Sequence, residues 1–110
     1  MEIVFRLQGR PNLAIEFVVD TGFDGFLSLP MVAIVLLGLP FDQRVIANLA
    51  DGRSERVDLF RATIVWEGND RAVTVLALGQ RPLLGTALLD GHDLAIRFVD
   101  GGSVAVLPVP

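Results

Sequence analysis

The chain of 110 residues contains no cysteine and only one histidine. The absence of cysteine excludes disulfide bonds, thiolate metal sites and a cysteine nucleophile. The one histidine, His92, could serve a serine hydrolase only beside a nucleophilic serine. The chain contains no G-x-S-x-G motif to supply that serine, so a serine hydrolase is not indicated. Basic residues are also few, because nine scattered arginines stand against 13 acidic residues and leave a net charge of -4. Nucleic acid is therefore not expected as the main partner.

Long apolar runs are missing as well. The longest, Met31 to Leu39, reaches about half of the roughly 20 residues that a membrane-spanning helix needs. The first residues, Met1 to Arg6, show no basic region followed by a long apolar one, so no signal peptide is indicated. These features predict a soluble, cytoplasmic protein, unless a longer natural chain carries an anchor.

The chain is instead rich in residues that form a hydrophobic core. Hydrophobic residues make up 52% of it, and the mean hydropathy is +0.56. Its length fits one domain, residues 1–110. Because this apolar content exceeds that of an ordinary soluble domain, we expect some apolar surface to be buried between chains. Self-association is therefore predicted from composition alone.

Apolar runs separated by turn signals predict an all-β domain, a small barrel or folded sheet, with two short helices. Asp51-Gly52 is the strongest short hairpin signal, and the polar residues after it indicate that this hairpin projects into solvent. Further turns are expected at Glu67–Asp70 and at Asp100–Gly102, and Pro108 and Pro110 should end any strand. The expected strands are Ile3–Leu7, Leu13–Val19, Phe26–Leu29, Arg44–Ala50, Arg53–Val65, Arg71–Leu78, Asp93–Val99 and Ser103–Leu107, and the expected helices are Met31–Leu37 and Thr86–Asp90.

The helix predicted at Met31–Leu37 has no polar face. Pro30 precedes it and Gly38 ends it, which is the usual asymmetry of helix ends. A helix that is apolar all round must be covered on every side. Two interpretations stay open: the helix is sunk in the core, or it contacts another chain in a dimer or higher oligomer.

The most informative stretch is Asp20-Thr21-Gly22, which follows the apolar run Ile15–Val19. Taken alone, this tripeptide is a common turn. With Leu83-Leu84-Gly85 further along the chain and Ala87-Leu88-Leu89 after it, however, the pattern resembles the retropepsin-like aspartic proteases. The adjoining Phe23-Asp24-Gly25-Phe26 and Leu29-Pro30 look most like bacterial single-domain members. The resemblance covers nearly the whole chain.

The resemblance implies a partly closed β-barrel that acts as a homodimer, with terminal strands pairing between chains. Two carboxylates in contact can divide the roles of base and acid, because like charges so close do not both ionise easily; the aspartic proteases themselves are the best-known example of this effect. A chain with one Asp-Thr-Gly must therefore take its second Asp20 from another copy. In such a site Asp20 activates water, the Thr21 hydroxyl reaches the partner's backbone, and Gly22 keeps bulk away. No cofactor or metal is implied.

The resemblance also implies substrate contacts. Asp24 would hold the substrate backbone, beside Phe23 and Gly25, and Asp51-Gly52 would form the tip of a flap that closes over the substrate. The alternatives are a turn-capping Asp24 and an ordinary hairpin turn. Two positions depart from the family: Phe23 brings a bulky ring to the edge of the site, and Thr86 stands where retroviral members place an arginine that braces the dimer.

Other interpretations remain. His92 with Asp90 and Asp93 could suggest a metal site, but adjacent residues rarely converge on one ion. Trp66 is more simply explained by core packing than by stacking on a substrate. The alternative to a peptide-cleaving enzyme is a non-catalytic dimerisation or peptide-binding module on the same fold, since a fold does not fix a function. A third, minor interpretation is lipid or membrane contact through Met31–Leu37.

Overall fold

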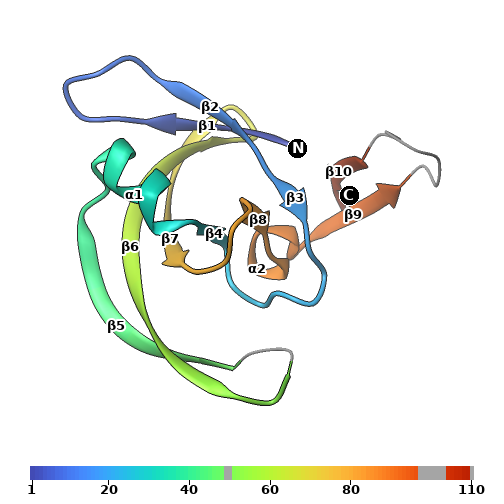
Figure 1. The fold of residues 1–110 in the computed structure, drawn as a ribbon. Coiled ribbons are helices and arrows are strands. Elements are labelled where there is room, and N and C mark those ends of the chain that lie inside the picture. The colour runs from blue at the N-terminus through green and yellow to red at the C-terminus, as the bar shows by residue number, and fades with distance from the viewer. Residues whose placement is uncertain (49–50, 97–103, 110) are drawn as a thin grey trace.

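The computed structural model describes residues 1–48, 51–96 and 104–109, and they form a strand-rich, nearly closed barrel with two short helices (Figure 1). The all-β prediction is confirmed at this level. The elements are β1 (Glu2–Arg6), β2 (Leu13–Glu16), β3 (Val18–Val19), β4 (Leu27–Leu29), α1 (Met31–Leu37), β5 (Phe41–Asn48), β6 (Ser54–Trp66), β7 (Asn69–Ala77), β8 (Leu83–Leu84), α2 (Thr86–Leu89), β9 (His92–Ile96) and β10 (Val104–Pro108).

Strand β6 is the longest and joins most of the sheet. Its first half pairs with β5, its last residues pair with β1 on the same edge, and β7 runs antiparallel along its other edge. Alternate residues Ala62, Ile64 and Trp66 are buried, as expected for a strand with one face on the core. Strand order is β2-β1-β6-β7-β4-β8-β3, so the chain curls round and brings β3 and β4 next to β8.

The core is filled mainly by branched aliphatic side chains and two phenylalanines. Phe5 and Phe17 stack with their ring centroids 6.0 Å apart. Burying side chains of this size contributes about 1.5–3 kcal/mol each relative to leaving them in water. The fully buried large residues are Phe5, Phe17, Ile3, Leu27, Leu29, Ile34, Ile64, Leu84, Leu88 and Val75.

Helix α1 confirms the predicted bounds but is only half covered. Ile34 and Leu37 are buried, whereas Val32, Val35 and Leu36 are 68%, 69% and 72% exposed. The helix is therefore not sunk in the core of a single chain. Its last carbonyl groups are held from the β1–β2 loop, where the Arg10 guanidinium donates to Leu36 O at 2.9 Å and to Leu37 O.

Several predicted strand boundaries are wrong. The strand expected at Leu13–Val19 is broken at Phe17, whose N–H bonds to Met1 O at 2.8 Å while its ring enters the core. Strand β5 begins earlier than predicted, at Phe41, and β7 begins at Asn69, inside the predicted turn. The last described pair of the β5–β6 ladder is Asn48–Ser54, and the end of the strand predicted at Arg44–Ala50 lies outside the described residues.

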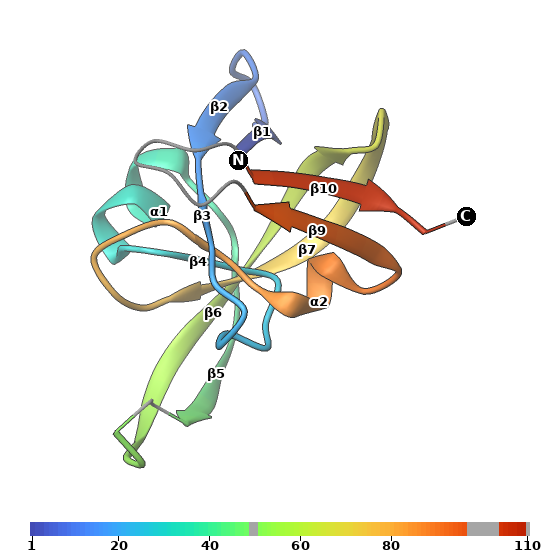
Figure 2. The ribbon, with the colours of Figure 1, turned by 90° about the vertical axis from the view of Figure 1, so that its right-hand side faces the viewer.

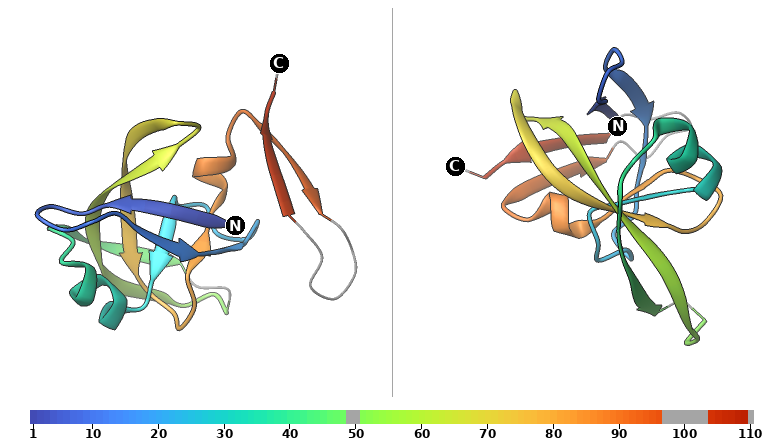
Figure 3. Two further views of the ribbon diagram at one scale, coloured as in Figure 1. Left: turned by 90° about the horizontal axis from the view of Figure 1, so that it is seen from above. Right: turned by 90° about the vertical axis from the view of Figure 1, so that its left-hand side faces the viewer.

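The last two strands form a separate two-stranded sheet, β10 with β9. Figures 2 and 3 show this C-terminal hairpin standing beside the barrel, next to α2. Pro108 is included in β10, opposite His92, rather than ending the strand before it. The turn predicted at Asp100–Gly102 lies outside the described residues. No helix among the residues described is long and apolar enough to cross a membrane.

Candidate active site

Asp20 lies where β3 ends, in a loop that is fixed at both sides. Its backbone N–H donates to Leu84 O at 2.9 Å, and its backbone carbonyl accepts from Phe23 N–H at 3.1 Å. The Gly22 N–H donates to the side-chain oxygen Oδ1 at 2.9 Å. The carboxylate is half-buried, while Thr21 and Gly22 are exposed beside it. The loop thus presents one oriented acid and an exposed hydroxyl to the solvent.

The segment Leu83-Leu84-Gly85 holds this loop from behind. Strand β8 pairs parallel with β3, which carries the acid, and antiparallel with β4, which leaves the loop. Beyond it, Gly85 N–H donates to Phe26 O at 2.8 Å, and Thr86 gives Phe23 O two donors, its N–H at 2.8 Å and its hydroxyl at 3.3 Å. Thr86 therefore anchors the loop within its own chain.

Gly85 and Gly25 leave room for the Phe23 ring. A Cβ on Gly25 would lie 2.6 Å from Phe23 Cζ, and a Cβ on Gly85 would lie 2.7 Å from both Phe23 Cδ2 and Phe23 O. Any side chain at either position must displace the ring or the loop backbone. The Phe23 ring thus packs against the two glycines, and Phe23 also contributes to a cavity wall.

A cavity of about 200 Å³ adjoins the acid loop. It is bounded by the loop, by β5 and by the end of β7, and its wall mixes aliphatic side chains with the polar residues Asp24 and Asn48. The predicted site residues Phe23 and Asp24 both line it. Sequence reasoning missed the other six residues, because no local motif marks them. They are Val45, Ile46, Ala47, Asn48, Leu76 and Leu78.

Asp51 and Gly52 are not among the cavity-lining residues. They lie in the exposed connection after β5, where the Asp51 carboxylate accepts from Arg53 N–H at 3.1 Å and from Arg53 Nε at 2.6 Å. Gly52 has a left-handed backbone, with φ of 83°. The predicted hairpin tip is therefore present, and the strand that leads to it, rather than the tip itself, faces the cavity.

A larger cavity of about 640 Å³ lies elsewhere, between the end of α1 and the middle of β6 and β7. It opens where β5 and β1 leave a gap along the edge of β6. Of the acid-loop region it includes only Phe26. Asp20 lines neither cavity, whereas Phe23 and Asp24, which follow it in the same loop, line the smaller one. We therefore assign the candidate site to the acid loop and the smaller cavity.

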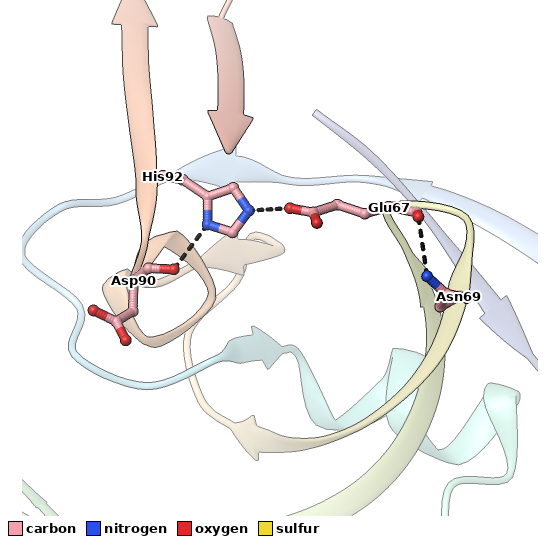
Figure 4. Close-up of polar contacts among 4 residues, drawn as sticks. All are labelled: Glu67, Asn69, Asp90 and His92. Carbon is pink, nitrogen blue, oxygen red and sulfur yellow. Dashed lines mark hydrogen bonds and ion pairs between the residues drawn. The ribbon is translucent and has the colours of Figure 1, made fainter. Parts of the chain in front are cut away.

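His92 makes contacts that do not fit a metal site. Its Nδ1 lies 2.8 Å from Asp90 O, and its Nε2 bonds to the Glu67 carboxylate, so Asp93 is not its partner (Figure 4). No metal-binding group of three acidic or histidine side chains occurs in the part of the chain that is described. Trp66 is buried in the core cluster, which confirms its packing role, and meets His92 edge-on with ring centroids 5.5 Å apart.

The described site therefore holds one oriented carboxylate, Asp20, and a second acid, Asp24, at the wall of a small cavity of mixed polarity. One carboxylate cannot easily act as base toward water and as acid toward a leaving group at the same moment. Comparison of this chain with models of protein families, with curated proteins and with solved structures finds no match.

Proposed function

We propose that this protein is an aspartic endopeptidase that acts as a homodimer. The observation that carries the proposal is the acid loop: Asp20 is oriented by Gly22 N–H and bonded to β8 through Leu84 O, and the same loop lines a small cavity through Phe23 and Asp24. An ordinary turn that contains an aspartate does not require support from a distant segment, whereas this loop is hydrogen-bonded to one. The Asp-Thr-Gly and Leu-Leu-Gly motifs of the resemblance meet in this one place.

The reaction needs both Asp20 side chains of the dimer. With one proton between them, the ionised carboxylate removes a proton from a water molecule, and that water attacks the peptide carbonyl carbon. The protonated carboxyl group hydrogen-bonds to the carbonyl oxygen. The tetrahedral intermediate then breaks its C–N bond, and the nitrogen receives a proton from the dyad, so the pair ends with one proton again.

The cavity at the acid loop suits one side chain of an extended peptide. Leu76, Leu78 and Val45 give it aliphatic walls, and Phe23 closes one side. Asp24 is exposed at the rim, where its carboxylate can accept a hydrogen bond from a substrate N–H. A volume of about 200 Å³ suits one side chain of modest size rather than an aromatic pair.

Exposed apolar side chains on the C-terminal hairpin support assembly of two chains. Ile96, Val104 and Leu107 are 46%, 37% and 57% exposed. An isolated two-stranded sheet is marginal in water, so pairing with a second copy offers this hairpin the partner that it lacks in one chain. The acid loop is itself exposed, as a site shared between chains requires.

The test is a peptide-library digest with wild type and Asp20→Asn between about pH 3 and pH 8. Wild type should cleave with a bell-shaped pH dependence, because neither the doubly protonated nor the doubly ionised pair can act. Asp20→Asn keeps the shape but removes the base, so cleavage should fall at least about a hundredfold, the lower end of what an acid–base group contributes. The dimer should stay at least as stable, since two neutral amides do not repel.

Asp42→Asn is the matched control, because Asp42 is an exposed acid on β5 outside the smaller cavity. It should cleave like wild type. Equal cleavage by Asp20→Asn would assign the activity to another site or a contaminant. Peptide binding by wild type with no cleavage at any pH would favour the non-catalytic binding module.

A further inference from the structure

The C-terminal hairpin is attached to the barrel through its first residue. His92 begins β9, and β9 pairs only with β10 among the strands described. The hairpin adds partly buried Val106 to the core cluster, while most of its other described side chains are exposed. Because a two-stranded sheet is marginal alone, the contacts of His92 bear directly on where this hairpin lies.

His92 joins three separate elements. Its Nε2 meets the Glu67 carboxylate in the β6–β7 turn, and its Nδ1 meets the Asp90 carbonyl at the end of α2 (Figure 4). Its ring lies edge-on to Trp66 at the end of β6. The His92 side chain is 10% exposed and that of Glu67 is 45% exposed. The imidazole ring is therefore mostly buried, and its contacts connect the start of the hairpin to the barrel.

Both ring nitrogens face groups that accept hydrogen bonds. A backbone carbonyl has no proton to donate, and an ionised carboxylate has none either. A neutral imidazole has one N–H and can satisfy only one of them, whereas the imidazolium has two and satisfies both. The other nearby acids do not compete: the Asp90 carboxylate points away from the ring in Figure 4, and Asp93 is exposed one residue further along β9.

We propose that His92 is a proton-operated clasp: the imidazolium ties the C-terminal hairpin to the β6–β7 turn, and loss of its proton releases the hairpin from that turn. The geometry of two acceptors around one ring requires the charged form, and the position of His92 at the start of β9 makes the hairpin the element that responds.

The direction of the pH dependence follows from the same contacts. The hydrogen bond that the His92 ring donates to the Glu67 carboxylate, and next the one that it donates to the Asp90 carbonyl, raise the pKa of His92 above its ordinary value of 6.5. A raised pKa in the attached state means that attachment is strongest below about pH 6.5 and weakens as the pH rises through the higher value. Lowering the pH therefore strengthens the attachment of the hairpin to the barrel, and raising the pH weakens it.

This clasp has a consequence that rests on the proposed function. The hairpin carries the apolar side chains proposed to pair two chains, so an attached hairpin offers a pre-ordered surface to the second copy. Dimerisation would then strengthen toward acid pH, the same side on which a shared-proton dyad works. The dimeric site would then assemble in the same pH range in which its two carboxyl groups can share one proton.

The experiment uses the full chain carrying Asp20→Asn, so that no cleavage can disturb it. His92 is the only histidine, and its ring protons give a single NMR titration without assignment. Hydrogen exchange of β9 and β10 amides, corrected for intrinsic rates, is followed over the same pH range. Glu67→Gln removes the acceptor charge but keeps the side-chain length, and Glu55→Gln, an exposed acid near the start of β6, is the matched control.

The expected result is a His92 pKa above 6.5 and protection of the hairpin that falls as His92 loses its proton. Protection should change by the factor that the measured shift dictates, about tenfold for each pKa unit. Glu67→Gln should lower the pKa and flatten the pH dependence, whereas Glu55→Gln should leave both unchanged. Either of two results in the Asp20→Asn protein would overturn the clasp: a His92 pKa at or below 6.5, or hydrogen-exchange protection of the hairpin that does not change with pH.

Sedimentation of the same samples separates this inference from the proposed function. A monomer at all pH values, with the expected titration and protection, supports the clasp and counts against the homodimeric enzyme. A dimer with unaltered protection across pH overturns the clasp and leaves the enzyme proposal standing on its own test.

Discussion

At the scale of single residues, Gly85 shows how closely the acid loop is packed. Its backbone is extended, with φ of -99°, so any residue could adopt the conformation. The restriction is space, because a Cβ there would overlap Gly25 O and lie 2.7 Å from Phe23 O. These two carbonyls accept hydrogen bonds from the chain just beyond, Gly25 O from Ala87 and Phe23 O from Thr86.

We therefore expect Gly85→Ala to destabilise the protein by about 3 kcal/mol, the upper part of the range for overpacked positions. Gly79→Ala is the control, because a Cβ at Gly79 meets nothing within 4 Å and its cost is only that of a left-handed backbone, about 1 kcal/mol. Urea unfolding of both variants measures the difference. Equal losses for the two variants would contradict the close packing behind the loop.

Residues with a local signature could be predicted from the sequence, and residues without one could not. Asp20, Thr21 and Gly22 follow a strand and form a turn, and turn chemistry is decided by a few neighbouring residues. Leu76 and Leu78 have no such signature, because they reach the cavity only through the pairing of β7 with β4 and the course of β5. Whether Leu76 and Leu78 point toward the cavity depends on the pairing register between distant segments, and composition does not encode that register.

At the scale of elements, the β5–β6 hairpin is the candidate for a moving part. Val45–Asn48 line the cavity, and the chain turns back just beyond them through Gly52, whose φ of 83° favours glycine. Its course was predictable only in part: the turn at Asp51-Gly52 lies where the sequence predicts it, but β5 begins at Phe41, before the predicted Arg44. Helix α1 shows the same division: its bounds follow local signals, but which face is covered depends on packing.

If the hairpin closes over the substrate, Gly52→Val should lower kcat/KM about tenfold or more, because strained turn geometry shifts the strand that lines the cavity. The free energy of unfolding should fall by about 1–2 kcal/mol. Gly9→Val is the control at a turn with a similar left-handed φ of 69° far from the cavity. Cleavage that drops equally in both variants would assign the effect to general destabilisation.

At the scale of the whole molecule, two apolar surfaces compete as places where chains meet. One is the C-terminal hairpin with Leu107, 57% exposed, and the other is the outer face of α1 with Leu36, 72% exposed. The proposed enzyme requires the first for its dimer. The second is available for a higher oligomer, as the apolar composition of Met31–Leu37 indicates.

Sedimentation at micromolar concentration should give a dimer or a multiple of it for wild type. Leu107→Asp should shift the protein to monomer, because a charge would be buried without a partner at the interface. Leu36→Asp should leave the dimer intact and remove only larger species. A dimer lost with Leu36→Asp but kept with Leu107→Asp would move the interface to α1 and contradict the hairpin assembly.

The pairing of β3 with β8 also bears on how the protein is made. Asp20 is bonded to Leu84, so the acid loop is closed by a contact between segments far apart in the chain. Contacts of such long sequence separation form late and slow the folding of a domain, because the intervening chain must first be ordered. During synthesis on the ribosome, the acid loop emerges well before the segment that supports it. A nascent or truncated chain ending before β8 would thus carry Asp20 in a loop that lacks its hydrogen bond to Leu84.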